Sequence, residues 1–351
     1  MKALSDHLRI ESFSQNMPPK KDNPTIYDVA RSAGVSIATV SRVLNTPELV
    51  GGAKRTAVFT AIDQLGFRPR ADARARAKRS AGRIGVITPF FTAPSFVQRL
   101  RGVASVLTET NYELVIFTVD TNERLNFYLD TIPLTHDLDG LILISVRVEG
   151  SIRQRLLDSH LETVLIEYPL IEFSSVEIDD REGGILAADY LLRKGHRQFA
   201  FVGETNFPKY GINPISSRLA GFQERLAQDN IHFTKEKIWE VPYQVSAAQQ
   251  IALEKLTLPD RPTAVFSATD LQAVGILKAA RQLGLRVPAD ITILGFDDLD
   301  IAEYVGLSTV RQPLDESGRV AAELLFSRLT DRSRSVQHIR LPLSLVERET
   351  S

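Results

Sequence analysis

The sequence predicts an α/β protein in which a short helical segment precedes a larger body built on parallel sheets. From residue 83 onwards, short and almost continuous apolar runs alternate with amphipathic helical patterns, which is typical of parallel strands buried on both faces. The runs number eight, more than one compact doubly wound sheet usually holds, so we expect the body to form two lobes. Before residue 67 the apolar residues recur at helical spacing instead.

Strands are expected where the apolar runs of the body occur. They cover residues 84–88, 113–117, 140–144, 164–167, 199–203, 264–268, 291–296 and 309–312. Helices are expected between most of these strands, for example at residues 95–110, 183–195, 217–229, 271–284 and 314–329.

Three helices are expected in the N-terminal segment. Thr25 and Asp28 form the pattern of a capping box, which marks the start of a first helix. Gly34 supplies a turn residue, and Ser36 can cap a second helix. A third helix is expected over about residues 53–65, where it meets a glycine. Three such helices can share one small core.

The charge of the chain is unevenly distributed. The 351 residues carry a net charge of −1, yet residues 20–83 contain 13 Lys and Arg against five Asp and Glu, which leaves +8 there and −9 elsewhere. A basic segment on a mildly acidic body is expected when one end of a protein meets a phosphate backbone. On charge alone, a solvated basic face is an equally good explanation.

Several protein classes are disfavoured by the composition. The chain has no cysteine, so disulfides, thiolate nucleophiles and cysteine-based zinc sites are absent. No stretch approaches the roughly 18 to 20 apolar residues of a membrane-spanning helix, and the N-terminus lacks the apolar run of a secretory signal. We therefore expect a cytoplasmic protein without membrane contact, with residues 1–22 as a flexible leader.

The second helix has an outward face suited to DNA. Its inward positions are apolar: Val40, Val43 and Leu44. Its outward positions are mixed: Ile37, Ala38, Ser41, Arg42 and Asn45. In a helix-turn-helix this helix enters the major groove, where Arg42 can pair with guanine and Ile37 can contact a thymine methyl. The alternative is an ordinary surface helix whose polar residues have no common role. That alternative does not explain why Ile37 would be exposed beside Arg42.

A resemblance to the lactose-repressor (LacI/GalR) family is carried first by residues 25–45, which read TIYDVARSAGVSIATVSRVLN. Further matches follow in the family's order: QLGFRP at 64–69, RLAGF at 218–222, LGFD at 294–297 and VRQP at 310–313. The similarity extends over residues 24–350.

The resemblance implies a helix-turn-helix headpiece, a hinge helix that folds on DNA, and a two-lobed periplasmic-binding-protein-like effector domain. It places the headpiece at 23–68, the hinge at 69–82, the N lobe at 83–179 with 309–336, and the C lobe at 180–308 with 337–351. It also implies a homodimer that reads a roughly palindromic operator. A dimer is favoured over a tetramer because no heptad pattern follows residue 345.

The hinge position is strongly basic and reads RADARARAKR at residues 70–79. Its alanines favour a helix, while repulsion among its cations opposes one unless a polyanion is near. Arg76 stands where many relatives carry a leucine that wedges into the minor groove, and an arginine suits a narrow A·T-rich groove instead. The start of the third helix also departs from the family, and Lys54 and Arg55 are the expected substitutes for its hydroxyl contacts. The full set of expected DNA-binding residues is Thr25, Tyr27, Ser36, Ile37, Ala38, Thr39, Ser41, Arg42, Asn45, Lys54, Arg55, Arg74 and Arg76.

A ligand is expected at the carboxyl ends of the strands, in the cleft between the lobes. The resemblance implies that Arg218 and Asp297 hold the effector, and the alternative is a structural ion pair and a turn cap. Glu167 replaces a usual aspartate, which makes its contact less direct. The expected effector-binding residues are Phe96, Glu167, Arg218, Tyr243, Asp270 and Asp297, with Phe90 and Tyr168 as further ring faces. A sugar is the family's commonest effector, and a purine or another metabolite is the alternative.

An enzyme is the competing class, and its sequence marks are missing. The chain has no G-x-G-x-x-G after a strand, no P-loop, no G-x-S-x-G and no H-E-x-x-H. Its six histidines lie far apart without metal-ligand spacing, so we expect no metal and no cofactor. A free solute-binding protein would share the two lobes but would lack the headpiece and need an export signal.

Overall fold

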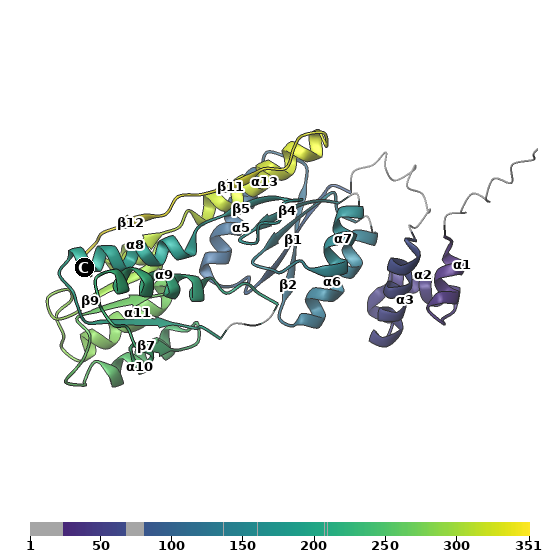
Figure 1. Cartoon of the computed structure of the whole chain (residues 1–351). Coiled ribbons are helices and arrows are strands. Elements are labelled where there is room, and N and C mark those ends of the chain that lie inside the picture. The colour runs from purple at the N-terminus through teal and green to yellow at the C-terminus, as the bar shows by residue number, and fades with distance from the viewer. Residues whose placement is uncertain (1–23, 68–80, 136, 160, 207, 209) are drawn as a thin grey trace, which may run out of the picture. The chain divides into compact units, whose positions relative to one another are not determined.

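A computed structural model describes residues 24–67, 81–135, 137–159, 161–206, 208 and 210–351. The chain divides into two compact units between residues 71 and 72 (Figure 1). The expected leader, residues 1–22, lies outside the described residues, as does most of the expected hinge, including Arg74 and Arg76.

The first unit contains the expected three helices. They are α1 (Ile26–Ser32), α2 (Ile37–Asn45) and α3 (Gly52–Leu65), with a 3₁₀ turn at Pro47–Leu49. Asp28 accepts hydrogen bonds from the backbone and hydroxyl of Thr25 at 2.9 and 2.7 Å, which confirms the predicted cap. Gly34 has a φ of 64° in the turn between α1 and α2, a backbone conformation that glycine adopts without strain. Val29, Val40 and Val58 are fully buried and form part of the shared core.

The second unit, which we call the body, holds two six-stranded sheets. The N-lobe sheet has the order β11-β5-β4-β3-β1-β2, and all its strands are parallel. Its strands are β1 (Arg83–Pro89), β2 (Glu113–Val119), β3 (Gly140–Ile144), β4 (Glu162–Ile166), β5 (Ser174–Glu177) and β11 (His338–Arg340). Helices α5 (Pro94–Leu107) and α13 (Leu314–Thr330) pack on one face, and α6 (Asn122–Thr135) and α7 (Gly150–Asp158) on the other (Figure 1).

The C-lobe sheet has the order β12-β10-β9-β8-β6-β7, and only β12 runs antiparallel to its neighbour. Its strands are β6 (Phe199–Gly203), β7 (Ile238–Glu240), β8 (Ala264–Ser267), β9 (Thr292–Asp297), β10 (Ser308–Arg311) and β12 (Ser344–Val346). Helices α8 (Asp180–Arg193) and α9 (Pro214–Gln228) cover one face, and α10 (Val245–Lys255) and α11 (Asp270–Gln282) cover the other. The short α12 (Asp300–Tyr304) follows β9.

Two of the expected lobe boundaries are wrong by a few residues. The strand β10, expected in the N lobe, pairs with β9 through Thr309 and Gly295 in the C-lobe sheet. The strand β11, expected in the C lobe, pairs with β5 through Ile339 and Val176 in the N-lobe sheet. The chain therefore crosses between the lobes after β10 and again between β11 and β12, because hydrogen-bond pairing rather than local sequence decides which sheet a short strand joins.

Close helix packing fixes the position of Arg218 on α9. A Cβ atom on Gly184 of α8 would lie 1.9 Å from the carbonyl oxygen of Arg218, and one on Gly221 would lie 1.9 Å from that of Arg181. The backbones of α8 and α9 therefore touch, which only glycine permits. Gly102 of α5 and Gly318 of α13 form the same kind of contact in the N lobe.

Candidate functional site

The helix α2 exposes the face that the sequence predicts. Val40 and Val43 are fully buried, whereas Ile37 is 41% exposed and Arg42 lies on the surface. Ser36 caps the helix, because its hydroxyl accepts the backbone N–H of Thr39 at 3.1 Å. The helix thus exposes an apolar side chain and a guanidinium, and its N-terminal cap carries hydroxyl groups.

The other expected DNA contacts of the described headpiece lie on all three helices. Ala38 is exposed, Thr39 and Ser41 are half-buried, and Asn45 is the last residue of α2. Tyr27 on α1 is 63% exposed. Lys54 and Arg55 lie in the first turn of α3, whose N-cap Gly51 provides no side-chain hydrogen bond. The headpiece therefore presents aromatic, apolar, hydroxyl and cationic groups together.

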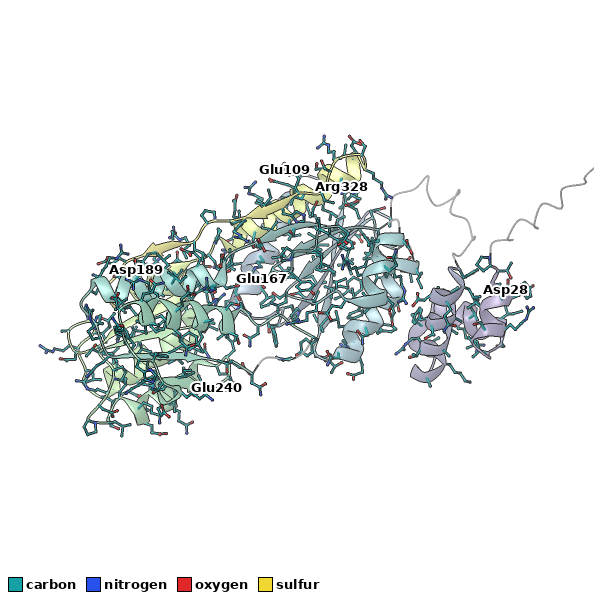
Figure 2. All side chains as sticks on the ribbon, in the orientation of Figure 1. Asp28, Glu109, Glu167, Asp189, Glu240 and Arg328 are labelled. Atoms are coloured by element: carbon teal, nitrogen blue, oxygen red, sulfur yellow. The ribbon has the colours of Figure 1, made fainter. Side chains whose placement is uncertain are left out.

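A pocket lies in the body at the carboxyl ends of the strands. It has about 750 Å³ of empty space, counted with its open mouth. Figure 2 labels Glu167, one of its lining residues, in the middle of the body. The lining residues come from both lobes: Phe90, Ala93, Ser95, Phe96, Arg99, Ser145 and Glu167 from the N lobe, Glu204, Pro208, Ile212, Pro214, Ile215, Arg218, Tyr243, Thr269 and Asp297 from the C lobe, and Gln312 from a crossover.

Four lining residues have a left-handed backbone at the end of a strand. Phe90, Ser145 and Glu167 directly follow β1, β3 and β4 with φ angles of 49°, 55° and 71°. Asp297 ends β9 with a φ of 117°. Such angles cost free energy for residues other than glycine and concentrate at functional sites. At each of these four residues the chain turns at the end of a strand, and the residue's side chain lines the pocket.

The N-lobe wall holds a buried ion pair. The guanidinium of Arg99 donates to Glu167, and the hydroxyl of Ser145 donates to the other carboxylate oxygen of Glu167. Arg99 also donates to the side-chain oxygen of Gln312 at 3.1 Å and lies 5.7 Å from the ring centre of Phe96. Arg99 is only 3% exposed, so this charge stays in the wall and is balanced there.

The C-lobe wall holds a second buried guanidinium. Arg218 donates from Nε to Asp180 at 2.8 Å and from an η nitrogen to the carbonyl of Ala268 at 2.7 Å. The same guanidinium lies 3.8 Å from the carboxylate of Asp297 and 3.6 Å from the ring centre of Phe296. The amide of Gln312 donates to Asp297 at 2.5 Å. Gln312 therefore connects Arg99 in one lobe with Asp297 in the other.

Burial changes the acidity of the pocket carboxyl groups. Burial raises the pKa of Asp180 to about 6, although the charge of Arg218 opposes the rise. Burial also raises the pKa of Asp297 to about 6, again opposed by Arg218 and by the hydrogen bond from Gln312. Burial and the charge of Asp297 raise the pKa of Tyr243, so its phenol stays protonated and can donate a hydrogen bond.

Five of the six expected effector residues line this pocket: Phe96, Glu167, Arg218, Tyr243 and Asp297. Asp270 is fully buried next to it, where its carboxylate accepts from Thr309 Oγ1 at 2.6 Å and from the backbone of Leu299 at 2.7 Å. This places Asp270 between the ends of β9 and β10, outside the lining. Of the two further ring faces, Phe90 lines the pocket and Tyr168 does not.

The sequence interpretation missed several lining residues. Ser145 and Gln312 directly follow the strands β3 and β10, so the expectation of a ligand at the carboxyl ends of the strands could have found both. Arg99 lies in the middle of α5 and gives no signal, because its burial depends on Glu167, which is distant in sequence. Glu204 likewise follows a strand, β6.

Metal binding and membrane insertion find no support in the described part of the chain. No three His, Asp or Glu side chains gather there as metal ligands would. None of its helices combines the length and apolar character needed to cross a bilayer.

Comparison with known proteins places both units. Residues 25–70 match the family of bacterial regulatory proteins called lacI, and residues 188–351 match the periplasmic binding protein-like domain. The chain is 32% identical over 333 residues to the HTH-type transcriptional repressor PurR of Vibrio vulnificus, with 93% of this chain and 98% of that protein covered. A solved complex of the transcriptional regulator CelR with cellobiose is similar at a TM-score of 0.68 and 27% identity, covering 93% and 100% of the two chains. The lac repressor dimer bound to operator and the anti-inducer ONPF is similar at a TM-score of 0.65 and 25% identity, covering 94% and 99%.

Proposed function

Because the chain belongs to the lacI family of bacterial regulatory proteins, we propose that α2 reads operator DNA and that a sugar in the interlobe pocket controls this binding. The chain is a transcription repressor with an effector-binding domain, and not an enzyme.

The DNA contacts are assigned from exposure and chemistry. Arg42 is the guanidinium on the exposed face of α2 and is suited to pair with guanine in the major groove. Ile37 and Ala38 are suited to thymine methyl groups, and Lys54 to phosphate. Tyr27, Thr39 and Ser41 add hydroxyl groups that can donate to phosphate oxygens, and the rest of the expected set, Thr25, Ser36, Asn45, Arg55, Arg74 and Arg76, is kept in the proposal.

A sugar fits the pocket because carboxylates and aromatic rings face the same space. Glu167 and Asp297 lie on opposite lobes, and both carboxylates can accept hydrogen bonds from hydroxyl groups. Phe96 and Tyr243 offer ring faces for the apolar side of a sugar. The relative that was solved with cellobiose supports this class. A purine would use the same rings, and the test below separates the two.

A thermal-shift screen of the full chain against sugars, nucleobases and phosphorylated metabolites tests this proposal. A ligand at 100 times its dissociation constant stabilises the folded state by roughly 2.7 kcal/mol, which shifts the melting temperature measurably. We expect a sugar to give the largest shift, and we expect Asp297→Asn to abolish it. Asp189→Asn is the matched control, since Asp189 pairs with Arg225 and does not line the pocket (Figure 2). A shift with nucleobases alone, or an equal loss in both variants, would refute the sugar assignment.

A homodimer is proposed from an exposed apolar surface that spans both lobes. Val97 on α5 is 48% exposed, and Ile301 and Tyr304 on α12 are 37% and 85% exposed. These helices are neighbours, because Gln98 donates to Asp300 at 3.1 Å. The relative solved as a dimer on its operator supports this assembly. Sedimentation should show a dimer, and Tyr304→Ala should weaken its association, whereas a monomer at micromolar concentration would contradict the proposal.

A further inference from the structure

A short stretch of the C lobe, residues 210–213, lies against the N lobe beside the pocket, and we call it the strap. Gly211 forms an isolated antiparallel bridge with Val146. The backbone N–H of Ile212 donates to the carbonyl of Ser145 at 3.2 Å. The strap lies between β6 and α9 in the sequence and directly precedes α9. The strap thus connects the lobes by backbone hydrogen bonds, separately from the crossovers near β10, β11 and β12.

Two side chains of the N lobe reinforce this contact. Arg147 donates from Nε to the carbonyl of Gly211 at 3.4 Å. The ring of Tyr210 packs on Phe90 with 6.1 Å between the ring centres, and Tyr210 also joins the apolar cluster of the N lobe. The side-chain contacts of the strap, those of Arg147 and Tyr210, can therefore each be removed by one substitution.

The other end of the strap is held firmly in the C lobe. Asn213 caps α9 by accepting the backbone N–H of Ser216 at 3.2 Å, and its amide donates to the carbonyl of Thr205 at 2.6 Å. Thr205 in turn donates to Glu240 on β7 at 2.7 Å. The strap continues directly into α9, whose backbone packs against that of α8, so it cannot leave the C lobe without disturbing this packing.

The strap also forms part of the pocket. Ile212 lines it, and so do Phe90 and Ser145, two of the N-lobe residues that the strap contacts. We propose that the strap is a gate: docked on the N lobe it closes one side of the pocket, and its release admits or frees the ligand. Ile212 then contributes an apolar wall to the closed pocket. The biological role of this gate rests on the proposed effector site, but its test needs no effector.

The test measures access of a thiol reagent to the pocket. The natural chain has no cysteine, so Ser95→Cys creates a single reporter thiol in the pocket lining of the full chain. The rate at which this thiol reacts with dithiobis(nitrobenzoate) is measured in the Ser95→Cys protein. It is then measured in double variants that also carry Tyr210→Ala or Arg147→Ala. Loss of the aromatic pair between Tyr210 and Phe90 favours the open form by roughly three- to tenfold. We therefore expect Tyr210→Ala and Arg147→Ala each to speed the reaction severalfold.

Matched controls separate gating from general loosening. Arg153→Ala removes an arginine of the same lobe that pairs with Glu172, and it should leave the Ser95→Cys rate unchanged. A thiol at Ser317, buried between α13 and α5, should react at the same slow rate with or without the strap changes. Unchanged Ser95→Cys rates in both strap variants would overturn the gate. So would equal acceleration at Ser317, or a Ser95→Cys rate already as fast as that of a thiol at the exposed Ser216.

Discussion

Arg42 is the side chain on which we expect discrimination between DNA sequences to depend most. Arg42→Ala should lower the preference for operator over random DNA by roughly 1 to 3 kcal/mol, because a bidentate pair with guanine is lost. Lys54→Ala is the control, and it should weaken binding to both DNAs to a similar extent, as a phosphate contact does. Competition measured by fluorescence anisotropy at one salt concentration separates the two. Equal losses on both DNAs for Arg42→Ala would show that it does not read bases.

Asp297 makes the stability of the body depend on pH. Its pKa is raised from 3.8 to about 6, so the folded state disfavours the ionised carboxylate. Its ionisation therefore lowers stability at pH 7, and this cost disappears as the pH falls from the folded pKa towards the unfolded one. Asp297→Asn mimics the neutral carboxyl and does not titrate. The free energy of unfolding of the variant minus that of the natural chain should therefore be about 1 to 2 kcal/mol larger at pH 7.5 than at pH 5.

Urea unfolding followed by the fluorescence of Trp239, the single tryptophan of the chain, measures this difference. Trp239 is buried on β7 in the C lobe and reports on the body. Ser105→Ala, at an exposed position of α5, changes no ionisable group, so it serves as the control and should show a difference that does not change with pH. A constant difference for Asp297→Asn between pH 5 and 7.5 would contradict the raised pKa.

The contact between α5 and α13 depends on two glycines. A Cβ on Gly102 would lie 1.9 Å from the carbonyl oxygen of Asp315, so Gly102→Ala must push the helices apart. We expect the free energy of unfolding to fall by roughly 1 to 3 kcal/mol or more. Ser105→Ala, at an exposed position of the same helix, should change it by about 0.5 kcal/mol or less. Similar stabilities of the two variants in urea would show that the helices accommodate the extra atom.

The hinge carries a prediction that rests on sequence alone, since residues 68–80 are not described. If Arg76 contributes a cation to the minor groove, Arg76→Leu should flatten the slope of log affinity against log salt by up to about one unit. Restoring a leucine wedge should also increase operator bending in circular-permutation gel shifts. An unchanged slope together with an unchanged bend would mean that residue 76 does not enter the groove.

Sequence patterns identified the elements that have an apolar run and missed the short strands that lack one. The strands at 140–144 and 199–203 were predicted to the residue, because they are continuous apolar runs. The strands β5, β7, β11 and β12 have only three or four residues, and β11 reads His-Ile-Arg, so no apolar pattern marks them. They form because the sheets offer edges with which they can pair. The same limit applies to the pocket: the family resemblance indicated Asp297, but only the fold brings Arg99 to Glu167.

The whole molecule combines a DNA-reading unit with a body whose pocket is made by both lobes. Hydrogen bonds run from Glu167 through Arg99 and Gln312 to Asp297, so groups of both lobes are connected beside the ligand position. A ligand in the pocket can favour one arrangement of the lobes only if it binds that arrangement more tightly than the other, which requires contacts that the two arrangements do not share. Any effect on DNA affinity is therefore expected to disappear when those contacts are removed.

The most direct test of this account measures operator affinity with and without the effector. The full chain selects its preferred DNA from a random library, and anisotropy titration then gives the affinity with and without the sugar that produces the largest thermal shift. We predict a roughly palindromic selected site and a change in affinity of fivefold or more, within the range typical of allosteric coupling. The change should be lost in Asp297→Asn and kept in Asp189→Asn. Failure to select any sequence, or an affinity that the bound sugar leaves unchanged, would contradict the account.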